Sequence, residues 1–151
     1  MLQNNNVLNN LKAIKKEIKN ASELAQLKKK INLVAVSKTI NSHFICEAAK
    51  SGQVSFGENK VQEAIHKWPQ IKKLYPKTIL HMIGPLQSNK VKDAIKIFDV
   101  IETVDREKVA IELKKNMDKY NIFPQLYIQV NIGEEKQKFG CKPTETKSFI
   151  D

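Results

Sequence analysis

The chain has 151 residues, enough for one domain with a sizeable core, and its 41% hydrophobic and 28% charged residues are ordinary for a soluble globular protein. The formal net charge is +10, but Arg106 is the only arginine and the lysines are spread along the whole chain, which argues against a specific nucleic-acid-binding surface. The two cysteines are far apart in the sequence, which argues against a disulfide framework and a metal site. The polar N-terminus argues against a signal peptide, and no apolar run approaches the ~20 residues of a membrane span. We therefore expect a cytoplasmic protein.

The first predicted element is an amphipathic helix over residues 7–30, because apolar residues recur at every third or fourth position. After it, short apolar runs alternate with helical patterns. We expect strands at residues 31–36, 54–56, 78–83, 99–104 and 126–130. We expect helices at residues 42–50, with Ser42 as the N-cap, and at 59–67, 88–98 and 106–120, and the start of another helix at the end of the chain.

This alternation predicts a parallel sheet with helices packed against it. The pattern alone leaves two closures open. One is an open doubly wound sheet, and the other is a (βα)₈ barrel of which about five strands are present. No GxGxxG motif follows the first strand, so the dinucleotide-binding version of the doubly wound sheet has no support.

Polar residues follow each predicted strand, at the end where α/β folds carry their working residues. They are Ser37-Lys38-Thr39, Gly57-Glu58-Asn59, His81 with 84–87, Thr103 with Asp105, and Gln129 with Asn131. A partly desolvated lysine at this end of a parallel sheet can attack a carbonyl, which makes Lys38 the most interesting of these residues. Taken singly, however, Lys38 fits a solvated strand end, and Asn59, His81 and Asn131 fit ordinary loop or core positions.

Four segments together resemble the pyridoxal 5′-phosphate (PLP) homeostasis protein family. They are VAVSKT at 34–39, FGENKVQE at 56–63, HMIGPLQSNK at 81–90 and QVN at 129–131. The resemblance implies an α/β fold, an incomplete TIM (β/α)₈ barrel of the alanine-racemase N-terminal-domain type (PLP fold type III). About five of its eight strands would lie in a single partial domain over residues 1–151.

The same resemblance implies a site on the barrel mouth. Lys38 would carry PLP as a Schiff base, and Asn59, His81, Ile83 and Asn131 would lie near the cofactor. The family suggests a PLP carrier in vitamin B6 homeostasis rather than an enzyme. Racemisation needs proton donors on both faces of the substrate, and the second domain of alanine racemase, which supplies one of them, has no counterpart in the family.

Relatives in this family are longer, and their later strands include the segment that binds the PLP phosphate. We therefore expect this chain to bind the cofactor more weakly than its relatives do. We also expect marginal stability, self-association, or pairing with a separate C-terminal half through open sheet edges. The alternatives are a non-functional or split-gene fragment of this family and a PLP-dependent amino-acid racemase.

Overall fold

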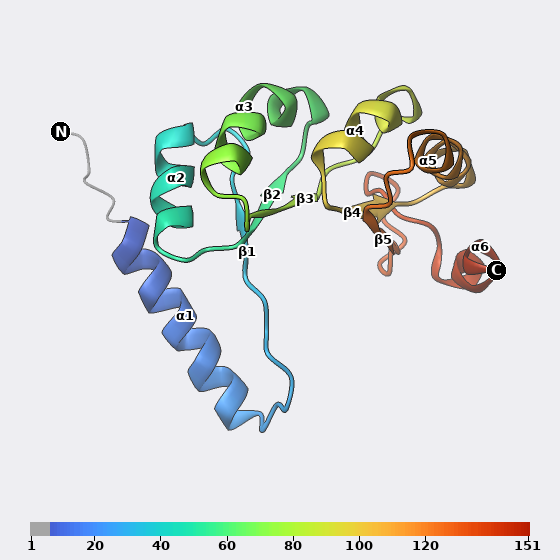
Figure 1. The fold of residues 1–151 in the computed structure, drawn as a ribbon. Coiled ribbons are helices and arrows are strands. Elements are labelled where there is room, and N and C mark those ends of the chain that lie inside the picture. Colours follow the sequence, from blue (N-terminus) through green and yellow to red (C-terminus); the bar gives the residue numbers. More distant parts are fainter. Residues whose placement is uncertain (1–6) are drawn as a thin grey trace.

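The computed structural model describes residues 7–151, which contain a five-stranded sheet with helices α2–α5 along one side of it (Figure 1). The strands are β1 (Val34–Val36), β2 (Ser55–Glu58), β3 (Ile79–Met82), β4 (Val100–Val104) and β5 (Gln125–Ile128). The α-helices are α1 (Val7–Leu24), α2 (Ser42–Lys50), α3 (Val61–Leu74), α4 (Val91–Ile97), α5 (Glu107–Tyr120) and α6 (Thr146–Ile150). Two short 3₁₀ helices are η1 (Ser88–Lys90) and η2 (Pro143–Glu145). Within residues 7–151, no helix is both long and apolar enough to cross a membrane.

The five strands are parallel, and each strand after β1 pairs with the strand that precedes it in the chain. A doubly wound sheet instead reverses its strand order near the middle and carries helices on both faces. Sequential order with α2–α5 on one side is the arrangement of consecutive units in a (βα)₈ barrel (Figure 1). Of the two closures that the sequence pattern left open, the structure therefore shows the barrel type.

The hydrophobic core lies between the sheet and its helices. Successive strand residues point to opposite faces, so Leu80 and Met82 are buried beneath the helices while Ile79 is 37% exposed on the other face. The largest fully buried side chain is Trp68 of α3, whose ring centroid lies 5.3 Å from that of Phe56 on β2. We call the side under α2–α5 the covered face of the sheet and the opposite side the open face.

The structure differs from the predicted elements mainly at helix ends. Helix α1 ends at Leu24 rather than near residue 30, and the turn after it places Gln26 at a left-handed φ of +50°. The N-cap of α2 is Asn41 rather than Ser42, because the Asn41 side chain accepts a hydrogen bond from the His43 amide at 2.9 Å.

Helix α3 is the element whose length was predicted least well. It runs to Leu74, well past the predicted end at residue 67, and it contains Pro69. Proline lacks the N–H of an interior helical residue and usually ends or bends a helix. Here the helix continues because Trp68 and Ile71, on either side of the proline, are buried in the core.

Candidate functional site

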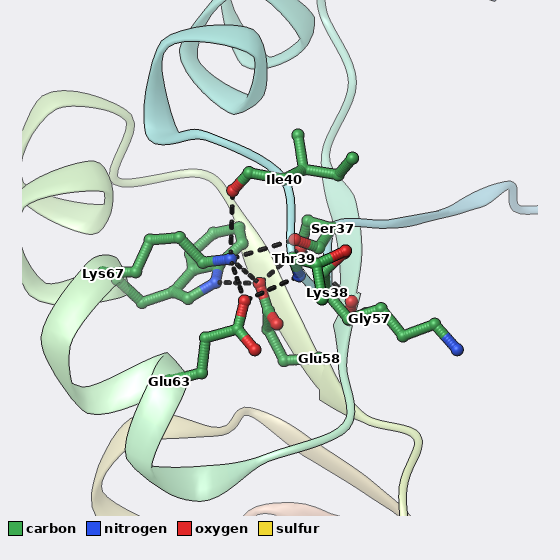
Figure 2. A network of polar contacts seen from close by, with 9 residues as sticks. Ser37, Lys38, Thr39, Ile40, Gly57, Glu58, Glu63 and Lys67 are labelled. Carbon is green, nitrogen blue, oxygen red and sulfur yellow. Dashed lines mark hydrogen bonds and ion pairs between the residues drawn. The ribbon is translucent and has the colours of Figure 1, made fainter.

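Lys38 lies two residues after the end of β1, in a tight turn at the C-terminal end of the strands. The Ser37 amide donates to the Gly57 carbonyl at 2.9 Å, and the Ile40 amide donates back to the Ser37 carbonyl at 3.1 Å. Between them Thr39 has a left-handed φ of +62°. Ser37 is buried, whereas Lys38 is exposed and its amine points away from the polar network beneath the turn (Figure 2). The turn thus presents the Lys38 amine to solvent on the far side from α3.

Two of the predicted site residues lie on β3 or directly after it, on the open face. Val36, Gly57 and His81 are register partners across β1, β2 and β3. A Cβ added at Gly57 would lie 2.9 Å from Cδ1 of Ile83, so the Ile83 side chain packs directly over this glycine. Because Gly57 has no side chain, Ile83 can lie across β2 on the open face.

The imidazole of His81 is held by a carboxylate on the next strand. Its Nδ1 lies 2.6 Å from Oε1 of Glu102, and since a carboxylate only accepts, Nδ1 carries the proton of this hydrogen bond. The other ring nitrogen, Nε2, is buried and finds no partner among the described residues. Glu102 therefore fixes the ring and leaves Nε2 for another partner.

Asn59 and Asn131 lie in different surroundings. Asn59 packs against Gly84, where an added Cβ would collide with the Asn59 carbonyl oxygen. Asn59 also lines a cavity of about 570 Å³, together with Lys60 and Lys90. Asn131 lies in the loop after β5, at the far edge of the sheet from Lys38.

The amide of Asn131 is used within that loop. It donates to the carbonyls of Glu135 at 2.9 Å and Lys138 at 3.4 Å, and its oxygen accepts from the Glu135 amide at 3.3 Å. The structure thus places Lys38 after β1 and His81 and Ile83 at the end of β3, with β2 between them. Asn59 lines an adjoining cavity, and Asn131 lies in a separate loop.

A buried polar network lies beneath the Lys38 turn on the covered face (Figure 2). At its centre is Glu58, the last residue of β2, which is fully buried. Its Oε1 accepts from the Ser37 hydroxyl at 2.8 Å, the Trp68 indole N–H at 3.1 Å and the Lys67 ammonium at 2.8 Å. Its Oε2 is buried without a partner among the described residues. Three donors on one oxygen fix the position of this carboxylate.

Lys67 of α3 joins Glu58 to the turn. Its side chain is only 9% exposed, and its ammonium donates to the carbonyls of Ser37 at 2.9 Å and Ile40 at 3.3 Å and to Oε1 of Glu63 at 2.9 Å. The same Glu63 oxygen accepts from the Thr39 amide at 2.7 Å. The hydrogen bond from Lys67 lowers the pKa of Glu63, burial opposes this shift, and the Thr39 amide adds to the lowering.

The sequence analysis assigned no role to Lys67, Glu63 or Glu102. The spacing of Glu63 and Lys67, four residues apart on a predicted helix, was a signal for an ion pair between them. Glu102 was detectable as a charged residue in the interior of the strand predicted at residues 99–104. Their contacts with the Lys38 turn and with His81 depend on the fold and were not readable from spacing.

Residues 9–151 match the family described as alanine racemase, N-terminal domain. A pyridoxal phosphate homeostasis protein of Buchnera aphidicola subsp. Schizaphis graminum is 43% identical over 141 residues, which cover 90% of this chain and 59% of that protein. The structure of PipY of Synechococcus elongatus PCC7942 with PLP bound matches with a TM-score of 0.72 at 35% identity, over 86% of this chain and 59% of that one. An alanine racemase from E. faecalis, 17% identical with a TM-score of 0.59 over 88% of this chain and 36% of that one, shares the fold.

Proposed function

The chain belongs to the alanine racemase N-terminal domain family, and from this premise we propose that it binds pyridoxal 5′-phosphate at Lys38 and serves the intracellular balance of that cofactor. The names of its relatives and the PLP bound to PipY support the proposal, although the chain spans only about 59% of their length. The observation that carries it is the exposed Lys38 amine, on a turn whose backbone is held from the opposite side.

The residues around Lys38 fit an aromatic aldehyde. PLP supplies an aldehyde that a lysine amine takes up as a Schiff base. Lys38 Nζ bonds to the aldehyde carbon and the aldehyde oxygen leaves as water, so the step needs no oxidant or reductant and reverses by hydrolysis. Val36, 52% exposed, and Ile83 offer apolar surface for a ring. Nε2 of His81, which has no partner within residues 7–151, offers a polar contact.

We assign the chain a carrier role rather than that of an amino-acid racemase. Inversion at carbon needs proton-transferring groups on both faces of the substrate. Lys38 supplies one such group from the open face, and the relatives are named for homeostasis. The chain incubated with PLP and L-alanine is therefore expected to leave optical rotation unchanged.

The experiment that tests the proposal is reductive trapping. The purified chain is mixed with PLP, reduced with borohydride and mapped by peptide mass spectrometry. We expect the label mainly on Lys38, and its loss in Lys38→Ala. Lys108→Ala, which removes an exposed lysine on α5, is the matched control and should label as the parent does. Binding of PLP by Lys38→Ala as tightly as by the parent would overturn the assignment.

A further inference from the structure

We propose that Lys67, with Glu58 and Glu63, acts as a positioning residue that holds the turn carrying Lys38 in the conformation that presents its amine to a carbonyl ligand. The inference deepens the proposed function and rests on it, because it concerns the geometry of the same amine. Lys67 itself does not meet the ligand, since it lies on the covered face while Lys38 points away from it (Figure 2).

The first support is the backbone conformation of the turn. Thr39 is β-branched and has a φ of +62°, a region that such residues rarely adopt without outside contacts. Its amide donates to Glu63 at 2.7 Å, which holds it in this conformation. Because Thr39 is the next residue after Lys38, a change in its φ would redirect the chain at the amine-bearing residue.

The second support is that one cation binds both ends of the turn. The Ser37 and Ile40 carbonyls stand on either side of Lys38 in the chain, and both accept hydrogen bonds from Lys67 Nζ. Lys67 therefore fixes the start and the end of the segment whose middle carries the amine. Removing the ammonium takes a donor from both carbonyls at once and leaves the Ser37 carbonyl with the Ile40 amide alone.

The third support is that the ammonium is itself fixed from two elements. Glu58 ends β2, and Glu63 lies in the first turn of α3, and each places a carboxylate oxygen within 2.9 Å of Lys67 Nζ. Glu58 is held in turn by the Trp68 indole and the Ser37 hydroxyl. The network therefore ties the ends of β1 and β2 and the start of α3 together beneath the amine.

A buried ion pair could also serve stability alone, and the two roles predict different results. A purely structural pair changes the fraction of folded molecules but leaves Lys38 equally reactive in those that are folded. A positioning pair changes the preference of an aldehyde for Lys38 over the other lysines of the same folded chain. The decisive measurement is therefore labelling selectivity, corrected for folded fraction by circular dichroism.

The first experiment compares Lys67→Met with Lys67→Arg, using PLP and borohydride as the probe. We expect Lys67→Met to lose about tenfold to a hundredfold of the labelling preference for Lys38, in line with the effect of misplacing a reactive group by ~1 Å. Arginine keeps the charge and several donors and should recover part of the preference. A folded Lys67→Met chain with the parent's preference would overturn the proposal.

The second experiment does not depend on Lys67→Met folding. Glu63→Gln keeps a side-chain oxygen that can accept from the Thr39 amide, whereas Glu63→Ala does not. Hydrogen exchange of the Thr39 amide, followed by NMR without any ligand, should be slow in the parent and in Glu63→Gln and faster in Glu63→Ala. In Glu63→Ala, the faster exchange of the Thr39 amide should be accompanied by weaker labelling of Lys38.

The outcomes separate the two proposals. If the parent shows no preference for Lys38, the proposed function fails, while the exchange of the Thr39 amide still reports whether the turn is held. If the parent prefers Lys38 and Glu63→Ala releases the Thr39 amide without changing that preference, the function stands and the positioning role fails.

Discussion

Lys38 and Lys67 lie on opposite sides of the same turn, and their surroundings differ completely. Lys67, 9% exposed on the covered face, is surrounded by two carboxylates and two carbonyls. Lys38 is exposed and directed away from that network (Figure 2). Burial among several acceptors makes a lysine part of the scaffold, while exposure at a strand end leaves an amine available for chemistry.

The same contrast runs across the sheet. On the covered face, alternate strand residues such as Leu80 and Ile101 are fully buried against helices. On the open face, Val36 and Tyr127 are about half exposed, at 52% and 50%. The two faces should therefore respond to substitution in different ways, and the following changes test this.

The largest effect is expected for Glu58→Ala. The change leaves the buried Lys67 ammonium without its shortest contact and deprives the Trp68 indole of its acceptor. Breaking a buried pair in this way costs about 3–5 kcal/mol, measurable as a lower free energy of unfolding in urea. Glu23→Ala is the control, because its pair with Lys19 is largely exposed and should contribute about 0–1 kcal/mol. Equal effects of the two changes would contradict the contrast between the buried pair and an exposed one.

Neighbouring residues on β3 give a matched comparison of the two faces. Leu80→Ala removes a fully buried side chain beneath the helices and should cost about 2–5 kcal/mol. Ile79→Ala, one residue earlier on the open face, should cost about 1 kcal/mol, because its side chain is already partly in solvent. Chemical denaturation of both variants measures the two losses in free energy of unfolding. A larger cost for Ile79→Ala would show that the open face is covered in solution.

The smallest effect is a pH dependence at Glu63. Its folded-state pKa is lowered by Lys67, with Thr39 and Lys60 adding to the shift. The stability that it contributes is therefore fully present above its ordinary value of 4.5 and is lost as the pH falls through the lower folded value. Glu63→Gln should be less stable than the parent at neutral pH, and the difference should shrink below pH 4.5. A difference that stays constant in thermal melts across this range would exclude the ion pair as its source.

Much of the fold was predictable because local pattern and tertiary packing agree. The helix over residues 42–50 was found with the observed bounds, and the five strands were found within three residues at each end. Helix ends were harder. Nothing in the run Leu24 to Lys30 marks the end of α1 in the way that glycine or proline does, and the passage of α3 through Pro69 depends on the burial of Trp68.

The candidate site was predicted only in part, and for a physical reason. Lys38 was proposed from its place after a strand and from a resemblance of short motifs, and both of these signals lie within single segments of the sequence. The Glu58–Lys67 pair joins a strand end to a helix, and its value depends on both side chains being buried together. Spacing along the sequence carries no information on that burial, so the residues that hold the Lys38 turn emerged only from the structure.

The sequential strand order has a consequence for how the chain is made. Every strand after β1 pairs with its immediate predecessor. Each new βα unit that leaves the ribosome can therefore pair with a strand that has already been synthesised, without any contact to later segments. The turn bearing Lys38 and the network beneath it involve only residues 37–68. That corner of the molecule can therefore assemble early in synthesis, with the later units added to it one by one.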